Sequence, residues 1–170
     1  IHPSKNLMKL VQLWKKNDFF DDYLLDVYGE VENFRYFYKF KSEIKNLKNL
    51  TYKGKINKYN LNHKLSKYDV LLHPSNSENF GLVILEAMSC GLFPIVNRKI
   101  DWQILDKNNL GYSSNFTYED LKRFIIKLNK SKKKIRGRNF YKKLRNFLSI
   151  HYNWKLIIDN YNQYYTRLIS

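Results

Sequence analysis

The run from Leu71 to Val96, LLHPSNSENFGLVILEAMSCGLFPIV, constrains the fold more than any other part of the chain. It begins and ends with short apolar segments. Between them lie a loop of Pro, Ser, Asn and Gly and an apolar stretch of helical length. A strand, a loop, a helix and a second strand form a βαβ unit, whose right-handed crossover makes the two strands parallel. The run therefore predicts an α/β fold built on a parallel sheet.

The same alternation of helical and strand-like patterns continues before this run. The sequence has no repeat and no Pro- or Ser-rich linker, and its 170 residues suit one domain with a sizeable core. We therefore predict one Rossmann-like domain over residues 1–170, with a parallel sheet and flanking helices. The patterns predict helices at Leu7–Lys16, within Asn33–Ile44, and at Leu61–Tyr68 and Leu82–Cys90, and strands at Leu24–Tyr28, Leu50–Lys53, Val70–His73 and Ile95–Val96.

The last third of the chain is predicted to be helical. Thr117 is a suitable N-cap, because its hydroxyl can accept a backbone N–H, and two acidic residues, Glu119 and Asp120, follow it in the first turn. Apolar residues then recur at helical spacing. They are Leu121, Phe124, Ile125 and Leu128, then Ile135, Leu144, Phe147 and Leu148, then Trp154, Ile157, Ile158, Tyr161, Tyr165 and Leu168.

Two glutamates of the central run, Glu78 and Glu86, stand eight positions apart. Eight residues of helix span roughly 12 Å, comparable to the reach from a hexose past a diphosphate to a ribose. The helix that carries Glu86 is apolar nearly all round, so we expect it to be buried, where a carboxylate needs a partner. The run holds no Arg, and a ligand with hydroxyl groups would suit Glu86. For two glutamates at this spacing alone, ligand binding is less common than the alternative, in which one Glu lies on a surface loop and the other pairs with a distant Lys.

The position of Glu78 favours a ligand. It follows the strand Val70–His73, and ligands of open α/β sheets bind beyond the carboxyl ends of the strands. Gly81 opens the helix without a side chain, so backbone N–H groups can approach a phosphate there. His73 ends the strand and either touches the ligand or is a satisfied structural histidine, which is the commoner case.

The residues around Glu78 and Glu86 match a known sequence motif in their order and spacing. The run resembles the Glu-x7-Glu motif of retaining glycosyltransferases of the GT-B fold, family four, usually written E-x-F-G-L-x-x-x-E-A-M-x-x-G-x-P. Many positions agree in order, which makes the resemblance specific. The agreeing residues are Glu78-Asn79-Phe80-Gly81-Leu82, Glu86-Ala87-Met88, Gly91 and Pro94.

The resemblance extends along most of the chain, with three departures. Both Leu92 and Phe93 stand where the family has a single residue, Asn79 replaces the commoner Gly, and Arg98–Trp102 replaces the usual Gly-Gly-x-x-Glu. Other segments resemble the family's Lys-Gly turn, its second and third strands, its Asn-Gly turn and the Ser-Trp of its last helix. These segments are Lys5-Asn6, Leu24–Gly29, Asn49–Gly54, Asn109–Tyr112 and Asn153-Trp154.

The resemblance implies that the chain is the C-terminal, donor-binding half of a GT-B fold, with a helical C-terminal end. The N-terminal acceptor domain, and the first strand with the family's phosphate-binding Arg, are expected to lie before Ile1. The longer protein is expected to be a retaining hexosyltransferase that uses a UDP-sugar or a GDP-sugar, and this fragment is expected to be inactive alone. The base, the sugar and the acceptor stay open.

The resemblance also implies roles for individual residues. Lys5 neutralises the leaving diphosphate, and Glu78 holds the donor hexose with the backbone of Asn79–Leu82. Glu86 takes the ribose hydroxyls. No cofactor or metal is expected, since the sequence has no Asp-x-Asp, and no nucleophile is assigned. The expected catalytic residues are Lys5 and Glu78, and the expected substrate-binding residues are Glu78, Asn79, Phe80, Gly81, Leu82, Glu86 and, near the base, Gly54, Lys55 and Ile56.

The chain is strongly basic, with 31 Lys and Arg against 15 Asp and Glu and a net charge of +16. The surplus is compatible with a solvated helix face in a Lys-rich sequence, with an anionic membrane surface, or with nucleic acid. The solvated face is the commonest case, and nucleic acid is not expected, because the aromatic residues have core-like spacing. The densest basic cluster is Lys130–Lys134, Arg136, Arg138, Lys142, Lys143 and Arg145.

Other chemistry finds little support in the sequence. The four histidines are scattered, and neither a G-x-G-x-x-G motif nor a P-loop is present. The single cysteine, Cys90, suits a reducing compartment, so we expect a cytoplasmic protein that can lie against a membrane. Two alternatives to a transferase remain: a non-catalytic glycosyltransferase-like binding module, and a basic adaptor for membranes or nucleic acid.

Overall fold

The computed structural model describes residues 1–130, 137–153, 155 and 158. Part of the predicted basic cluster and most of the last apolar stripe therefore lie outside the described residues, namely Lys132–Lys134, Ile135, Arg136, Trp154, Ile157, Tyr161, Tyr165 and Leu168.

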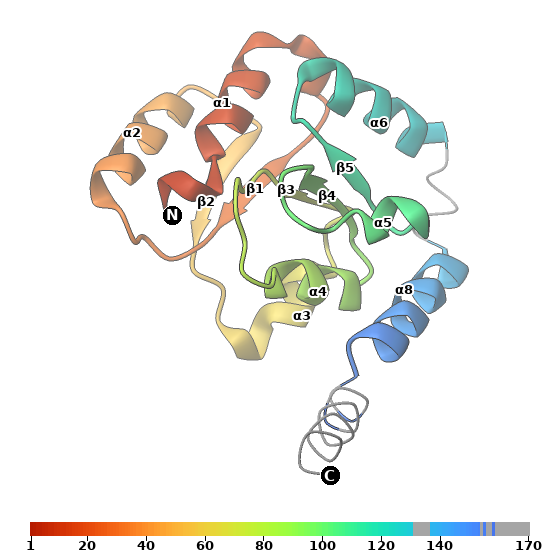
Figure 1. Ribbon diagram of the computed structural model, residues 1–170. Coiled ribbons are helices and arrows are strands. Elements are labelled where there is room, and N and C mark those ends of the chain that lie inside the picture. Colours follow the sequence, from red (N-terminus) through yellow and green to blue (C-terminus); the bar gives the residue numbers. More distant parts are fainter. Residues whose placement is uncertain (131–136, 154, 156–157, 159–170) are drawn as a thin grey trace.

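Helices lie on both sides of centrally placed strands (Figure 1). The strands are β1 (Leu25–Tyr28), β2 (Leu50–Gly54), β3 (Val70–His73), β4 (Phe93–Asn97) and β5 (Tyr112–Ser114). The helices are α1 (Leu7–Lys16), α2 (Phe34–Ile44), α3 (Leu61–Leu65), α4 (Leu82–Ser89), α5 (Ile104–Lys107), α6 (Tyr118–Lys130) and α8 (Arg138–His151). The predicted α/β class is confirmed, and most predicted bounds lie within two residues of those observed.

All strand pairs are parallel, in two groups. Strand β1 pairs with β2, and β3, β4 and β5 form a sheet in that order. Strand β4 is central in its sheet, and all five of its residues are buried. The parallel strands bring their carboxyl ends to a common edge, where the loops that follow β3 and β4 begin.

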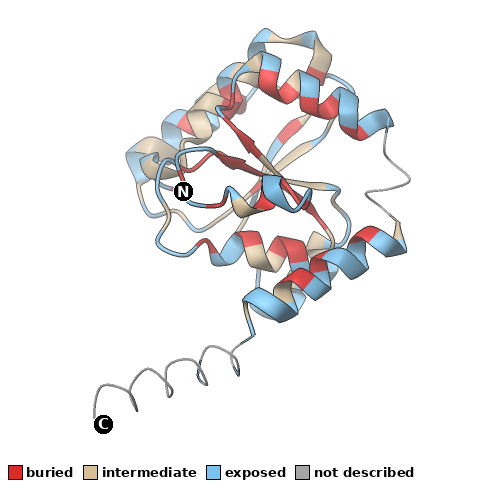
Figure 2. Cartoon of the chain, turned by 45° about the vertical axis from the view of Figure 1, so that its right-hand side comes forward, coloured by how far each residue is buried: buried red, intermediate tan, exposed pale blue. Residues whose placement is uncertain are grey.

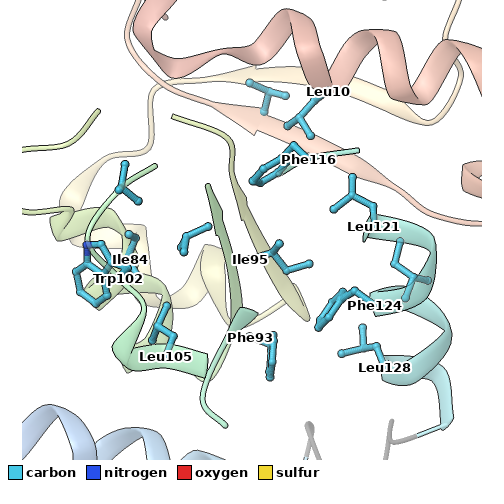
Figure 3. Close-up of a cluster of buried hydrophobic side chains, with 14 of the residues drawn as sticks. Leu10, Ile84, Phe93, Ile95, Trp102, Leu105, Phe116, Leu121, Phe124 and Leu128 are labelled. Atoms are coloured by element: carbon cyan, nitrogen blue, oxygen red, sulfur yellow. The ribbon is translucent and has the colours of Figure 1, made fainter. Parts of the chain in front are cut away.

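The core lies on both faces of β4. Figure 3 shows Ile95 between apolar side chains of α6 and a second group from α4, α5 and the loop before α5. Figure 2 shows the same pattern, with buried residues along the strands and on the inner faces of the helices. Each large apolar side chain removed from water contributes roughly 1.5–3 kcal/mol. The labelled side chains are Leu10, Ile84, Phe93, Ile95, Trp102, Leu105, Phe116, Leu121, Phe124 and Leu128.

Two sequence predictions need correction. The helix predicted over Leu61–Tyr68 ends at Leu65, because the chain turns there toward β3. The helix expected to be buried all round, α4, is buried on one face only: Leu82 is 63% exposed and Val83 is 39% exposed. Both side chains line cavities at the carboxyl edge of the strands instead of packing into the core.

The strand β5 was missed, because its three residues carry little apolar periodicity. The described residues contain no helix that is long and apolar enough to cross a bilayer. Within the described part of α8, Arg138, Lys142, Lys143 and Arg145 are exposed, and contact of this face with a membrane stays a prediction.

Helix α6 begins as the sequence predicts, since the Thr117 hydroxyl accepts the Asp120 N–H at 3.2 Å. We expect Thr117→Ala to lower the free energy of unfolding by about 0.5–2 kcal/mol, because one N–H at the helix start loses its partner. Thr117→Ser keeps the hydroxyl and should cost much less. Urea unfolding of both variants measures the difference, and equal losses would assign the effect to packing of the Thr methyl group.

Candidate functional site

Two loops that are distant in sequence meet at the carboxyl edge of β3. One is the 3-10 turn Pro3–Lys5, which precedes α1, and the other follows His73. The backbone carbonyl of Ser4 accepts the N–H of Asn76 at 2.9 Å and the hydroxyl of Ser75 at 3.3 Å. These hydrogen bonds fix the start of α1 against the loop that carries the predicted donor residues.

The residue after Lys5 adopts an unusual backbone. Asn6 has φ +53°, in the left-handed region that Gly and Asn tolerate best. Its side-chain amide donates to the carbonyl of Pro74 at 3.3 Å. Asn6 stands where the resembled segment has Gly, in a backbone conformation that Gly adopts readily, and its side chain adds a contact between the two loops.

The contact between the loops centres on Glu78. Its Oε1 atom lies 2.6 Å from Lys5 Nζ and 2.9 Å from His73 Nε2. The Glu78 side chain is 14% exposed, whereas that of Lys5 is 42% exposed. The structure therefore brings the predicted residues Lys5 and Glu78 together, and it gives His73 the structural partner that the sequence left open.

Charge and burial oppose each other at this carboxylate. Burial alone would raise the pKa of Glu78, but the hydrogen bond from Lys5 and the neighbouring His73 and Ser75 lower it overall. Burial lowers the pKa of His73 and outweighs the opposite effect of the Glu78 carboxylate. Glu78 is thus an ionised acceptor at neutral pH, and His73 is a neutral donor toward it.

A cavity of about 440 Å³ opens beside this pair. It is lined by Lys5 and by the loop and first helical residues Ser77–Val83. Helix α4 starts there behind Gly81, which has φ +77° and provides no side-chain cap for the first N–H groups. The uncapped start of a helix favours negative charge, so the cavity has the features of an anion-binding site. Five residues that the sequence predicts to bind substrate line this cavity, namely Glu78, Asn79, Phe80, Gly81 and Leu82.

The remaining predicted residues lie elsewhere. Glu86 sits further along α4 and is partly exposed, and its carboxylate has no hydrogen bond or salt bridge with the residues that the structure describes. Gly54 ends β2, Lys55 and Ile56 follow it, and none of the three lines the cavity beside Lys5. Lys55 instead pairs with Glu30 at 2.5 Å.

Sequence reasoning missed Trp102 as a support of the site. Trp102 is buried, and a Cβ atom added at Gly81 would lie 2.8 Å from its Nε1 atom. Its ring stacks on Tyr152 at 5.8 Å, and Phe80 contacts the edge of Tyr152 at 6.0 Å. Trp102 belongs to the segment Arg98–Trp102 that departs from the resembled pattern, and here it packs against the start of α4.

A family of known proteins matches most of this chain. The chain belongs to the glycosyl transferases group 1 family. The family match covers residues 1–145, which include both loops of the site. No relative among the curated proteins matches the sequence. The group 1 membership makes glycosyl transfer the activity of this family, and the fold is that of the C-terminal, Rossmann-like half of GT-B glycosyltransferases.

Solved structures share this fold at low sequence identity. The catalytic domain of cholesterol-α-glucosyltransferase from Helicobacter pylori has TM-score 0.64 and 18% identity, over 86% of this chain and 92% of that chain. WaaG, a glycosyltransferase involved in lipopolysaccharide biosynthesis, has TM-score 0.66 and 20% identity, over 88% and 40%. The pneumococcal O-GlcNAc transferase GtfA, in complex with UDP and GlcNAc, has TM-score 0.62 and 20% identity, over 99% and 34%. The chain thus spans 34% and 40% of the chains of GtfA and WaaG, respectively.

Gly81 permits a test of the packing behind the site. Any side chain at a left-handed position costs about 1–2 kcal/mol, and overpacking against buried Trp102 should add about 1–3 kcal/mol in Gly81→Ala. Gly54→Ala is the matched control, because Gly54 has φ +79° and nothing lies within 4 Å of its added Cβ. Urea unfolding should give Gly81→Ala a clearly lower free energy of unfolding than Gly54→Ala. Similar losses would contradict the tight contact with Trp102.

The histidine beside Glu78 permits a test by pH. The lowered pKa of His73 means that the unfolded chain binds a proton more readily than the folded one below the ordinary value of 6.5. This contribution to stability is therefore full above about pH 6.5 and is lost as pH falls through the folded pKa, at up to about 1.4 kcal/mol per pH unit. His73→Gln keeps a donor for Glu78 without titrating and should flatten the loss between about pH 7.5 and 5.

Exposed His63 supplies the control for this experiment. His63→Gln removes one histidine without touching the site, and chemical unfolding at a series of pH values compares the three proteins. An unchanged pH slope in His73→Gln would mean that His73 is not held neutral by burial.

Proposed function

We propose that the chain is the donor-binding domain of a retaining glycosyltransferase and binds a nucleoside-diphosphate hexose, with UDP or GDP as the nucleotide. The observation that carries the proposal is the Lys5–Glu78 pair, 2.6 Å apart, in a cavity at the uncapped start of α4. A cation, a helix N-terminus and an ionised carboxylate side by side suit a ligand that offers phosphate oxygens next to sugar hydroxyls.

Binding of the donor would divide the present ion pair between two parts of the ligand. The partly exposed Lys5 can turn its ammonium to the diphosphate and stabilise the negative charge that develops as the diphosphate leaves. Glu78, whose pKa is lowered, stays ionised and accepts hydrogen bonds from the hexose hydroxyls. His73 holds Glu78 in place from its buried side and need not touch the sugar.

The other roles follow the resemblance of the motif. The backbone of Asn79–Leu82 lines the hexose, and Glu86, whose carboxylate has no partner among the described residues, takes the ribose hydroxyls. Gly54, Lys55 and Ile56 lie near the base. Positive charge and the helix N-terminus serve the diphosphate in place of a metal. Transfer to an acceptor needs the longer protein, so we expect donor binding but no turnover from this chain alone.

A non-catalytic binding module is the second candidate. It rests on the same Lys5–Glu78 pair and cavity, which can hold a donor whether or not transfer follows. Donor binding is common to both candidates. Turnover by the longer protein, lost on Lys5→Ala and Glu78→Ala, distinguishes the enzyme from the module.

Removal of each glutamate should weaken the binding of a different set of ligands. Glu86→Ala should weaken both the bare nucleoside diphosphate and the nucleotide sugar about tenfold or more, since a hydrogen bond to a charged group contributes about 1.5–3 kcal/mol. Glu78→Ala should weaken the nucleotide sugar alone, because it leaves Lys5 free for the phosphates. Titration calorimetry with UDP, GDP, UDP-glucose and GDP-mannose, all in EDTA, measures both effects.

Glu43→Ala, on the exposed face of α2, is the control for loss of a surface carboxylate. Equal losses of affinity for the bare nucleoside diphosphate in Glu78→Ala and Glu86→Ala would contradict the separate roles assigned to the two glutamates. Unchanged binding in both folded variants would make the motif structural, and binding that appears only with Mn²⁺ would contradict metal independence.

A further inference from the structure

A buried polar side chain lies at the carboxyl end of the central strand. Asn97, the last residue of β4, is only 4% exposed. The register pairs Val96 of β4 with His73 of β3, so Asn97 lies beside Pro74, one residue further along each strand. A buried amide is costly unless its polar atoms have partners. The partners of Asn97 therefore show what this side chain holds together.

The side chain of Asn97 is hydrogen-bonded through both its nitrogen and its oxygen. Its Nδ2 atom donates to the carbonyl of Pro74 at 3.1 Å and to Oδ1 of Asn76 at 3.3 Å. Its Oδ1 atom accepts the backbone N–H of Lys99 at 3.1 Å. An amide NH2 group carries two hydrogens, and both are used here. Asn97 thus joins the loop after β4 to the loop after β3.

A second asparagine reaches the same two acceptors from the start of α1. Nδ2 of Asn6 donates to the Pro74 carbonyl at 3.3 Å and to Asn76 Oδ1 at 3.4 Å. Because each acceptor oxygen has two lone pairs, the two NH2 groups and the two oxygens satisfy one another. We call this arrangement the amide clasp. It consists of the side chains of Asn6, Asn76 and Asn97 and the carbonyl of Pro74.

The amide clasp joins three segments that are distant in sequence. Asn6 directly follows Lys5. Asn76 lies two residues before Glu78, and Asn97 ends β4. The turn that carries Lys5 and the loop that carries Glu78 are therefore tied to each other. Through Asn97 they are also tied to the central strand of the sheet, which is the most buried part of the fold.

The spacing of Lys5 and Glu78 matters because both face one ligand in the proposed function. The diphosphate and the hexose of a donor are joined covalently, so the two side chains bind both parts only from fixed relative positions. The Lys5 side chain is 42% exposed, so its position depends mainly on the backbone that carries it. Groups that are already in place bind a ligand more tightly, because less conformational entropy is lost on binding.

We propose that Asn97 is a positioning residue for donor binding, which holds the Glu78 loop and the Lys5 turn at the spacing that one nucleotide sugar requires. Asn97 does not line the cavity beside Glu78, so it acts through the amide clasp and does not touch the ligand. The inference rests on the proposed function, since it needs a donor that Lys5 and Glu78 bind together. It adds to the site a residue of β4, outside the run between Glu78 and Glu86.

Two variants open the amide clasp from different segments. Asn97→Ala removes one pair of donors. Asn6→Gly removes the other pair and should fold, because Gly tolerates the φ of +53° at this position and the Asn6 side chain does not cap α1. Ser113→Ala is the control, since Ser113 is buried on β5 and its hydroxyl has no hydrogen-bond partner among the described residues. Urea unfolding establishes that each variant is folded.

Titration calorimetry then compares UDP with UDP-glucose and GDP with GDP-mannose. Asn97→Ala should weaken the bound nucleotide sugar about tenfold, because the contact of Glu78 with the hexose is misplaced. The bare diphosphate should weaken less than about twofold, because Lys5 can still reach its phosphates. Asn6→Gly should act in the same direction, and Ser113→Ala should leave both affinities unchanged. In a chain that already carries Glu78→Ala, Asn97→Ala should weaken the nucleotide sugar no more than the bare diphosphate.

A second measurement needs no ligand. Burial raises the pKa of Glu78, but Lys5 and its other partners lower it overall. Opening the amide clasp should let Lys5 move away from the carboxylate. Carbon-13 NMR titration of the Glu78 carboxyl should therefore show a pKa closer to its ordinary value in Asn97→Ala and in Asn6→Gly. Ser113→Ala should titrate as the unaltered chain does.

The outcomes separate this inference from the proposed function. If the unaltered chain binds none of the four nucleotides, the proposed function is overturned and the positioning role with it. If it binds them, equal losses of nucleotide sugar and bare diphosphate in Asn97→Ala and Asn6→Gly would overturn the positioning role alone. An unchanged Glu78 titration in both variants would do the same. If Asn97→Ala does not fold, Asn6→Gly decides by the same measurements.

Discussion

The parallel pairing of β3 with β4 is the constraint on which the rest of the structure depends. Parallel strands cannot be joined by a tight turn, so the chain between them must cross the sheet, and α4 is that crossing. The loop before the crossing is consequently placed at the carboxyl edge of β3. Both the cavity beside Glu78 and the uncapped start of α4 follow from this single topological requirement.

The candidate site consists of side chains of the protein that satisfy one another's hydrogen bonds and charges. Lys5 and His73 both contact the same oxygen of Glu78, and the lowered pKa of Glu78 keeps its charge in a mostly buried position. A buried carboxylate without such partners would be costly. The proposed donor would replace the Lys5–Glu78 ion pair, so its contacts with both side chains must be as favourable as that pair. This requirement favours ligands that offer phosphate oxygens to Lys5 and sugar hydroxyls to Glu78.

The turn Pro3–Lys5 is held from two sides. Its Ser4 carbonyl accepts the Asn76 N–H of the loop after β3, and the Ile1 carbonyl just before the turn accepts the N–H groups of Glu32 and Asn33, which follow β1. The position of Lys5 beside Glu78 therefore depends on segments that follow both β1 and β3.

The sequence by itself determined the order and most bounds of the elements other than α5 and β5, the N-cap at Thr117 and the loop that surrounds Glu78. These features depend on local periodicity, capping and turn chemistry. Tertiary structure alone decided that Lys5 and His73 meet on Glu78, that Trp102 supports Gly81, and that one face of α4 is open. Contacts between distant segments have no local pattern, and the burial of an apolar helix depends on which neighbours cover it. The interrupted strand pairing is the clearest case, since β1 and β3 were both predictable from the sequence but the absence of a ladder between them is seen only in three dimensions.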